Sequence, residues 1–362
     1  MEGNTRMVVR KKRRIAVAVL AVLLLIVSGC SPEVTTNGDG GQRLTLNFAT
    51  FWPGEDYQIA EGHHSWAAEI ESRVLEETDH TVQITFHSGG SLLGATEIYE
   101  GVALGAADIG STCPSYTPGI FRASSVLELP GFNNPDALTA SLTIQEAYET
   151  IEEIQKEYSD VKVMHFWATG PGDILSTVPV ESLEDLSGME IRVASGSVPA
   201  IEALGARPVS MPMSESYLAL NQGIVKGLLG PTDILRGFRL AEVTDYIIKT
   251  PWLYNVVFVK VMNQNTWDSL PEDVQQIFDE VNAKYVTEYG KLRTSYTEEG
   301  QQYAADNYGH QIVTLSEEEE ARWIEALSSV QEQWVSDMDR YQIDGKGLLE
   351  QVNEIDERLS QE

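Results

Sequence analysis

The sequence predicts an α/β protein built from two similar domains. Strand and helix patterns alternate along the chain, which opens with a strand, an amphipathic helix and a second strand. A unit made of a helix, a glycine and a short apolar strand occurs twice, at Gly105 and 118 residues later at Gly223. Without its first 29 residues the chain of 362 keeps 333, a length that suits two domains sharing a cleft.

The amino terminus has the pattern of a secretory signal at residues 1–29. A basic cluster at residues 10–14 precedes an apolar run from Ile15 to Val27, which is shorter than the about 20 residues of a membrane-spanning helix. The run ends in Val27-Ser28-Gly29-Cys30, which resembles the bacterial lipobox, where the cysteine is acylated and becomes the first mature residue. We expect a lipid on Cys30; an ordinary cleaved signal with an incidental cysteine is the alternative.

Residues 30–42 are rich in Thr, Asn, Gly and Asp and predict a flexible tether. With Cys30 lipidated, Cys113 is the one remaining cysteine, so no disulfide framework is expected. The domains must then be stabilised by burial alone.

The formal net charge is −30, and removing six basic residues and one acidic residue with the signal makes it −35. Such acidity excludes nucleic acid as a partner and favours solubility beside a membrane. It also repels anionic ligands, so an acidic ligand needs a basic residue in its pocket.

A βαβ unit begins the first domain. Apolar residues alternate with polar ones at 44–48 and again at 82–86, as half-buried strands require. Between them, apolar residues recur at helical spacing from Ile59 to Val74.

The repeated unit supports two domains with one plan. A helix at 96–104 ends at Gly105, and a second helix through residues 217–220 ends at Gly223. Each is followed by a short apolar strand, at Ile109 and at Ile224-Val225.

Further strands are predicted at 161–167, 188–193 and 253–261, the first and last crossing between the domains. Pro271 suits the first turn of a helix, and the chain beyond it reads as helical, with a packing stripe from Trp323 to Trp334. The resulting division is domain I at 43–166 with 253–285, domain II at 167–252, and C-terminal helices at 286–362 that pack across both.

Five stretches, in order between Leu44 and Tyr285, resemble the dicarboxylate-binding family, the substrate-binding proteins of tripartite ATP-independent periplasmic (TRAP) transporters. They are Gly105-Ala-Ala-Asp-Ile-Gly110, Leu127-Glu-Leu-Pro-Gly-Phe132, Leu183-Glu-Asp-Leu-Ser-Gly-Met-Glu-Ile-Arg-Val193, Ala203-Leu-Gly-Ala206 through Met211-Pro-Met-Ser-Glu215, and Trp267-Asp-Ser-Leu-Pro-Glu-Asp-Val274. The resemblance implies a class II periplasmic-binding-protein-like fold, in which two α/β domains joined by hinge strands and a long connecting helix close around a ligand.

Arg192 is the strongest candidate for a ligand-binding residue. The resemblance implies that the arginine of this motif holds the ligand carboxylate through a two-pronged salt bridge, and a planar, permanently charged guanidinium suits that task. The alternative from spacing alone is that Arg192 pairs at the surface with Glu184, Asp185 or Glu190.

Two positions depart from the family pattern. Where a second arginine is usual, the chain reads Ala168-Thr-Gly-Pro-Gly172-Asp173, and where an asparagine often touches the carboxylate it has Gly230. Lys226 stands where an acid is usual; it either faces solvent or replaces part of the lost charge. These changes favour a small or apolar monocarboxylate over a sugar acid.

Other candidates for ligand contact lie in loops after strands, where open α/β sheets place their ligands. They are Trp52 and Glu55, Cys113 and Tyr116, Met213 as an adaptable apolar lid, Gly172 and Gly230, and Trp167, Trp252 and Asn255 beside the crossings. For each aromatic residue, core packing is the alternative.

We expect no enzyme, metal site or cofactor. His63, His64, His80 and His87 form no HExxH pattern, and His63 lies on an apolar helix stripe, which favours a structural histidine. Cys113 has no nearby histidine in sequence, and no Gly-x-Ser-x-Gly, phosphate loop or Gly-x-Gly-x-x-Gly follows a strand.

The sequence thus predicts an exported, lipid-anchored protein that captures a small organic acid and delivers it to TRAP membrane subunits. Two alternatives are kept: a binding protein of an ATP-driven uptake system, and the ligand-sensing subunit of a receptor.

Overall fold

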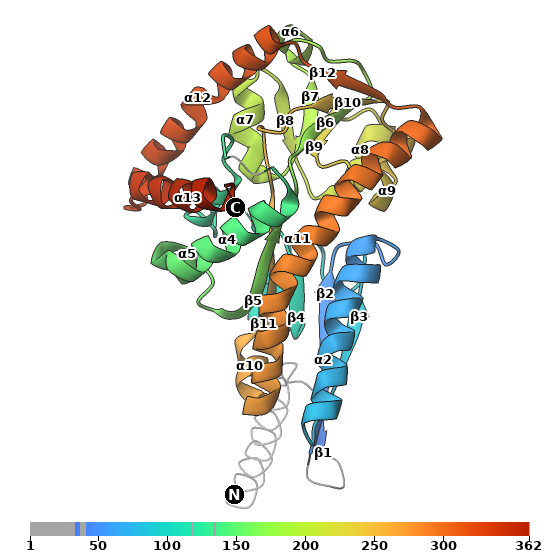
Figure 1. The fold of residues 1–362 in the computed structure, drawn as a ribbon, viewed down its shortest axis with the longest axis vertical. Helices are drawn as coiled ribbons and strands as arrows, with labels where there is room; N and C mark the ends of the chain where they lie inside the picture. Colours follow the sequence, from blue (N-terminus) through green and yellow to red (C-terminus); the bar gives the residue numbers. More distant parts are fainter. Residues whose placement is uncertain (1–32, 37–40, 118, 133–134, 362) are drawn as a thin grey trace, which may run out of the picture.

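The computed structural model describes residues 33–36, 41–117, 119–132 and 135–361. They form two α/β domains, each built around a six-stranded sheet, stacked along the long axis of the molecule (Figure 1). The two-domain α/β prediction is confirmed. The predicted signal and Cys30 lie outside the described residues.

The sheet of the first domain has the order β1-β2-β4-β11-β5, with β3 on the other side of β2. Strands β2, β3 and β4 are parallel, as the predicted βαβ unit requires, whereas β11 runs antiparallel to both of its neighbours. The strands are β1 (Glu33–Thr36), β2 (Gln42–Thr50), β3 (Thr81–His87), β4 (Ile109–Thr112), β5 (Val161–Ala168) and β11 (Val257–Asn263).

The sheet of the second domain has the order β12-β10-β6-β9-β7-β8. Its central strands are fully buried, and β7 lies parallel to both β8 and β9. The strands are β6 (Asp173–Ser176), β7 (Glu190–Val193), β8 (Arg207–Ser210), β9 (Gly227–Gly230), β10 (Tyr246–Lys249) and β12 (Gln311–Thr314).

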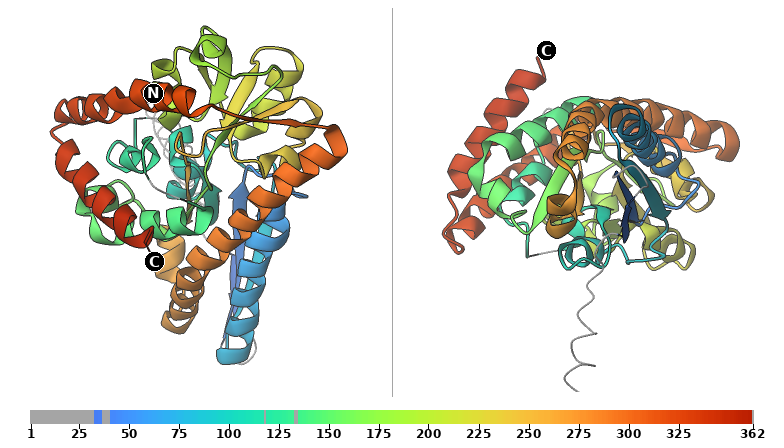
Figure 2. Two further views of the ribbon diagram at one scale, coloured as in Figure 1. Left: turned by 45° about the horizontal axis from the view of Figure 1, so that its top comes forward. Right: turned by 90° about the horizontal axis from the view of Figure 1, so that it is seen from below.

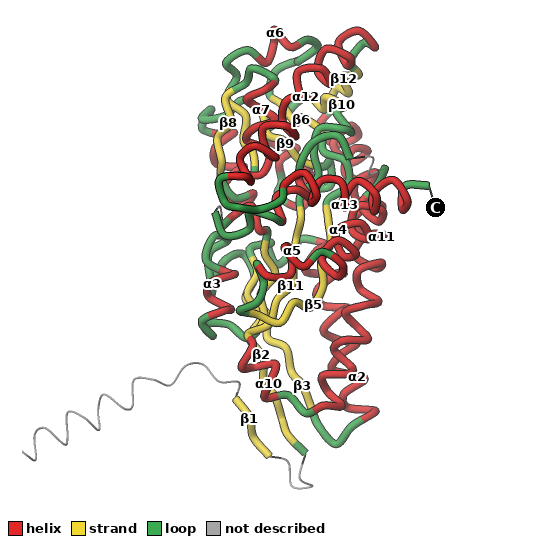
Figure 3. Tube along the Cα trace, turned by 90° about the vertical axis from the view of Figure 1, so that its left-hand side faces the viewer, coloured by secondary structure: helices red, strands yellow, loops and turns green. Residues whose placement is uncertain are grey.

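Two chain crossings lie side by side between the sheets, after β5 and before β11. They are hydrogen-bonded to each other: Thr169 N donates to Val256 O at 3.0 Å, Val256 N donates to Thr169 Oγ1 at 2.8 Å, and Gly172 N donates to Tyr254 O at 3.1 Å. The two hydrogen-bonded crossings connect the domains and lie at the position of a hinge between them (Figure 3).

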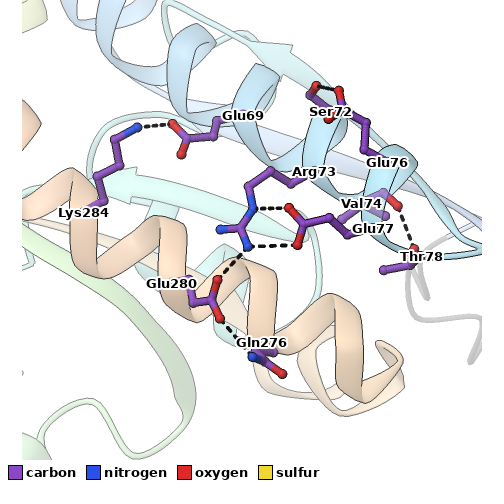
Figure 4. Close-up of polar contacts among 10 residues, drawn as sticks. All are labelled: Glu69, Ser72, Arg73, Val74, Glu76, Glu77, Thr78, Gln276, Glu280 and Lys284. Atoms are coloured by element: carbon purple, nitrogen blue, oxygen red, sulfur yellow. Dashed lines mark hydrogen bonds and ion pairs between the residues drawn. The ribbon is translucent and has the colours of Figure 1, made fainter.

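Helix α11 (Glu272–Tyr308) is one continuous helix of 37 residues that runs diagonally from the first domain to the second (Figure 1). It begins after Pro271 and ends at Gly309, whose φ of 74° is the left-handed conformation typical of a helix end. Salt bridges tie it to α2 (His64–Glu77), from Arg73 to Glu280 at 2.6 Å and from Lys284 to Glu69 at 2.7 Å (Figure 4).

The remaining helices cover the sheets. Helix α12 (Glu317–Asp339) contacts α6 and α7 of the second domain, and α13 (Gly345–Leu359) contacts α4 of the first, so the carboxyl-terminal pair wraps one side (Figure 2). The others are α3 (Ile98–Ala103), α4 (Ala137–Thr150), α5 (Glu152–Lys156), α6 (Leu183–Leu186), α7 (Val198–Ala203), α8 (Ser216–Asn221), α9 (Ile234–Gly237) and α10 (Gln264–Ser269). None of the described helices is long and apolar enough to cross a bilayer.

The repeated unit is present in both domains, but its second strand begins later than predicted. Helix α3 leads through Gly105, with φ of 79°, into β4, and α8 leads through Gly223, with φ of 70°, to β9, which begins at Gly227 and not at Ile224-Val225. Each glycine takes a left-handed conformation that L side chains rarely adopt.

The structure differs from the predicted division at three places. Residues 33–36 of the predicted tether form β1, because their backbone pairs antiparallel with β2. The predicted boundary at 285/286 falls inside α11, whose buried stripe continues without a break. The segment beyond 286 was expected to be helical throughout, yet β12 adds an edge strand parallel to β10.

Candidate functional site

A narrow cavity lies between the two domains beside the crossings. Its volume is about 20 Å³, and most of its lining is apolar or aromatic. The lining residues are Phe51, Trp52, Tyr116, Thr169, Arg192, Ala194, Met213, Pro231, Ile234, Phe238, Tyr254, Val256, Phe258 and Arg293. Two larger hollows lie nearby in the described chain; one of them shares Phe51, Met213 and Phe238 with the cavity, and neither is lined by Arg192.

Arg192 lies in this cavity at the carboxyl-terminal half of β7, where the side-chain alternation between Ile191 and Val193 turns it toward the cleft. Its side chain is 1% exposed. Nε and Nη2 donate to the carbonyl of Met211 at 3.0 and 2.7 Å, which holds the guanidinium plane in one orientation.

Arg192 has no carboxylate partner among the described residues. The three acids near it in sequence are occupied elsewhere: Glu184 pairs with Arg322 at 2.6 Å, Asp185 accepts from the start of its own helix, and Glu190 lies 3.5 Å from Arg207. The surface-pairing alternative is therefore wrong. A buried, permanently charged guanidinium is stabilised by a nearby anion, and the described residues supply none to Arg192.

Tyr116 joins the first domain to this cation. Its hydroxyl oxygen accepts hydrogen bonds from Arg192 Nη2 at 3.3 Å and from the backbone N–H of Met213 at 3.0 Å, both in the second domain. Burial raises the pKa of Tyr116 to about 12 although Arg192 opposes the shift, so the phenol stays protonated and keeps its own O–H as a donor.

A second arginine, Arg293, reaches the cavity from α11 and was missed in the sequence. It is as buried as Arg192, but its Nη2 forms a salt bridge at 2.8 Å with the equally buried Asp233 of the second domain. Tyr57 of the first domain also donates to Asp233. The signal was present in the sequence: Arg293 follows Tyr289 by one helical turn on the buried stripe of α11.

The walls of the cavity are aromatic. Phe51 and Trp52 stack with ring centroids 4.0 Å apart, and Phe258 closes against Trp52 at 5.1 Å. Met213 and Phe238 approach from the second domain. Such a pocket suits a ligand with an apolar or planar body.

Two of the predicted contact residues, Gly172 and Gly230, lie behind apolar side chains and do not line the cavity themselves. At Gly172 a Cβ would overlap the ring of Tyr254, and at Gly230 it would lie 2.6 Å from Ile234 Cδ1. Tyr254 and Ile234 both line the cavity, so the two glycines leave room for these side chains.

The other predicted contact residues lie outside the cavity. Glu55 is exposed in an outer groove, and Cys113 and Trp167 are buried behind the wall. Trp252 donates to Glu320 at 2.7 Å, and Asn255 is buried beside a separate shallow hollow. Lys226 faces solvent, which answers the question left open by the sequence.

The described residues contain no cluster of His, Cys, Asp and Glu arranged to hold a metal ion. His63 is buried against Phe48 and is hydrogen-bonded to Tyr289, as expected of a structural histidine. Burial raises the pKa of the Cys113 thiol well above its ordinary value, which disfavours the thiolate that a nucleophile needs.

Comparison with known proteins agrees with this geometry. Residues 49–337 match the family described as bacterial extracellular solute-binding protein, family 7 (DctP). A TRAP periplasmic solute-binding protein from Desulfovibrio salexigens is 32% identical, with a TM-score of 0.72 over 86% of this chain and 95% of that chain.

Two further relatives differ in their ligands. A marine metagenome TRAP solute-binding protein specific for aromatic acids, in complex with 3-hydroxybenzoate, is 25% identical, with a TM-score of 0.82 over 88% of this chain and 99% of that chain. The C4-dicarboxylate-binding periplasmic protein DctP of Rhodobacter capsulatus is 26% identical over 74% of this chain and 80% of its own length. The chain therefore belongs to the DctP family, the periplasmic solute-binding proteins of TRAP transporters.

Proposed function

We propose that this protein captures a small apolar or aromatic monocarboxylate between its domains and delivers it to the membrane subunits of a TRAP transporter. The observation that carries the proposal is Arg192, a buried guanidinium in an interdomain cavity with no carboxylate partner among the described residues. A ligand carboxylate accepts from Arg192 and from the free O–H of Tyr116.

The charge balance of the cavity favours one carboxylate over two. Arg192 and Arg293 are its two cationic lining residues, and Asp233 neutralises Arg293 at 2.8 Å. A second ligand carboxylate would be buried without a free cation, at a cost of several kcal/mol.

The aromatic walls favour an apolar ligand body. Phe51, Trp52 and Phe258 offer ring faces and edges rather than hydrogen-bond donors, so hydroxyl groups of a sugar acid would lose their water without finding partners. The relative that binds 3-hydroxybenzoate supports an aromatic acid as the ligand class.

In this proposal, ligand binding and closure of the two domains occur together. Domain rotation about the hydrogen-bonded crossings brings Arg192 and Met213 onto Tyr116, and excluding water strengthens the ion pair with the ligand. The chemistry is capture and release, without a catalytic step.

The test is calorimetry on the chain without its first 30 residues, titrated with benzoate, 3-hydroxybenzoate, pyruvate and succinate. We expect the aromatic acids to bind most tightly and Arg192→Ala to weaken them at least about 100-fold, the effect of removing a buried ion pair. Arg207→Ala, which removes an exposed arginine of the same domain, is the control. Tighter binding of succinate, or unchanged affinity in Arg192→Ala, would contradict the proposal.

We further propose that Cys30 carries a lipid that holds the exported protein at the membrane. The support is the signal-like pattern before Val27-Ser28-Gly29-Cys30. Metabolic labelling with a fatty acid should mark the wild-type protein and leave Cys30→Ala unlabelled and released from membranes. A soluble, unlabelled wild type would refute the anchor and leave the solute-binding function intact.

A further inference from the structure

Two first-domain carboxylates are buried where the closed domains meet, one on each side of the ligand cavity. Asp56 follows β2, and Glu128 ends the short helix at Ser124–Glu128; both side chains are 3% exposed. Neither lines the ligand cavity, and among the described residues neither has a salt-bridge partner within 4 Å. Ligand binding as described above does not use them.

Each carboxylate lies against a glycine of the second domain. A Cβ at Gly237 would overlap Asp56 Oδ2, and a Cβ at Gly196 would overlap Glu128 Oε2. Closure therefore removes these oxygens from water and places backbone, rather than a donor side chain, against them. Opening the domains separates the oxygens from both glycines.

The hydrogen bonds that remain come mainly from the first domain. Asp56 Oδ1 accepts from Gln58 N at 2.8 Å. Glu128 Oε1 accepts from Val257 N at 3.0 Å, and its Oε2 accepts from Ser115 Oγ. These hydrogen bonds offset part of the free-energy cost of removing the two carboxylates from water, but they supply no positive charge.

The charged neighbours do not compensate both groups. Asp56 faces Asp233 and Arg293, and the Arg293 guanidinium is paired with Asp233 and not with Asp56. The adjoining groove is lined by Tyr57 and by charged groups of both signs: Glu55, Glu61, Arg236, Arg239 and Glu299. Glu128 faces Cys113 and Tyr158, and the hollow beside it carries Arg122, Asp337 and Arg340.

We propose that domain closure takes up protons at Asp56 and Glu128, so that ligand capture is coupled to proton uptake. This inference rests on the proposed function, because closure around a ligand is the event that buries the two groups. Burial raises the pKa of each carboxyl to about 7, with Asp233 adding to the effect at Asp56.

The sign of the pH dependence follows from linkage. In the open form an ordinary carboxyl titrates near about 4, so between about pH 4 and 7 the closed form binds more protons than the open form. Affinity is therefore greatest on the acid side, falls as pH rises toward 7 and becomes constant above about 8. The expected loss is about tenfold per carboxylate between pH 6 and pH 8.

The test is calorimetry with 3-hydroxybenzoate at pH 6 in buffers of different ionisation enthalpy, which counts the protons bound. We expect about two protons per ligand for the wild type and about one for each of Asp56→Asn and Glu128→Gln. Glu157→Gln is the matched control, since this carboxyl also has a raised pKa but contacts its own domain. Binding without proton uptake, or uptake unchanged in both variants, overturns the inference and leaves the proposed function standing.

A measurement without ligand distinguishes a failure of this inference from a failure of the proposed function. On the chain without its first 30 residues, which lacks Cys30, spin labels at Leu104→Cys and Leu218→Cys report the interdomain distance from exposed positions in different domains. The remaining cysteine, Cys113, is buried and does not compete for label. The closed population should rise from pH 8 to pH 6 in the wild type and respond less in Asp56→Asn and in Glu128→Gln. A distance distribution independent of pH overturns the inference whether or not any acid binds.

Discussion

Two buried basic residues of this protein, Arg192 and Lys260, differ in what their burial indicates about anion binding. Both side chains are almost completely buried, and neither has a carboxylate partner among the described residues. Arg192 lies in a cavity and is oriented by Met211 and Tyr116. Lys260 lies in the core of the first domain with no hydrogen bond to Nζ.

The chemistry of the two groups explains the difference. Lys260 Nζ lies 3.6 Å from the ring centroid of Trp66 and 5.1 Å from that of Tyr289, and burial lowers its pKa well below the ordinary value. An ammonium can lose its proton and remain as a neutral amine, whereas a guanidinium stays charged and requires an anion. Burial of a basic residue therefore indicates an anion site only where the charge cannot be lost.

The largest expected effect is at Arg192→Lys. The lysine ammonium lacks the planar guanidinium that can bind Met211 O and a carboxylate at the same time, and burial lowers the pKa of an ammonium, as at Lys260. We expect affinity for aromatic acids to fall about 100-fold, with the midpoint of thermal unfolding little changed. Calorimetry measures the affinity, and a thermal melt measures the unfolding midpoint. If the variant kept its affinity, a point charge alone would be enough to bind the ligand, and the contrast between Arg192 and Lys260 would be weakened.

Lys260→Met should stabilise the protein and spare the ligand site. An apolar side chain of similar length removes the cost of burying an amine without a partner, and we expect a gain of about 2 kcal/mol in unfolding free energy at pH 7. Because the pKa of Lys260 is lowered in the folded state, the wild type becomes more stable as pH rises toward the ordinary pKa of lysine. The difference in unfolding free energy between Lys260→Met and the wild type should therefore be smaller at pH 9 than at pH 7. Urea unfolding at both pH values measures this difference, and a larger difference at pH 9 would contradict the prediction.

Gly172→Ala tests whether the position of the Tyr254 ring beside Gly172 matters for ligand binding. The added Cβ overlaps the Tyr254 ring, which must move into the cavity or away from it. We expect a loss of about 1–2 kcal/mol in stability, typical of overpacking, together with weaker ligand binding. Gly205→Ala, a strained but open glycine with nothing within 4 Å, controls for backbone effects; equal loss of binding in both variants would remove Tyr254 from the argument.

The smallest effect is expected at Tyr116→Phe. The variant loses the hydroxyl that accepts from Arg192 and Met213 and, in the proposal, donates to the ligand. The expected loss is about 1 kcal/mol of binding free energy, close to tenfold in affinity. Tyr148→Phe, which removes a hydroxyl far from the cavity, should leave affinity unchanged. Affinity equal to that of the wild type in Tyr116→Phe would confine its role to packing.

Much of the fold was predictable because it depends on local periodicity. The βαβ opening, the two helix-glycine-strand units and the packing stripe from Trp323 to Trp334 in α12 were all visible as spacings of two or about 3.6 residues. Strand β12 was missed because it has four mostly exposed residues and forms only by pairing with β10, far away in the sequence. Likewise β1 exists through its pairing with β2.

The candidate site was predictable only in part. Arg192, Trp52, Tyr116 and Met213 line the cavity, since they follow or end strands whose carboxyl ends meet at the cleft. The other candidates lie beside the crossings as expected, but their side chains make contacts outside the cavity; they are Trp167, Trp252 and Asn255.

The sequence by itself determined the opening βαβ unit, the two-domain plan and the motif around Arg192, because these depend on neighbours along the chain. The tertiary structure alone decided which charges find partners. Asp233 neutralises Arg293, no acid reaches Arg192, and Asp56 and Glu128 are buried against glycines of the other domain. Pairing and burial depend on groups from different domains that the folded structure brings together, and no local spacing in the sequence predicts them.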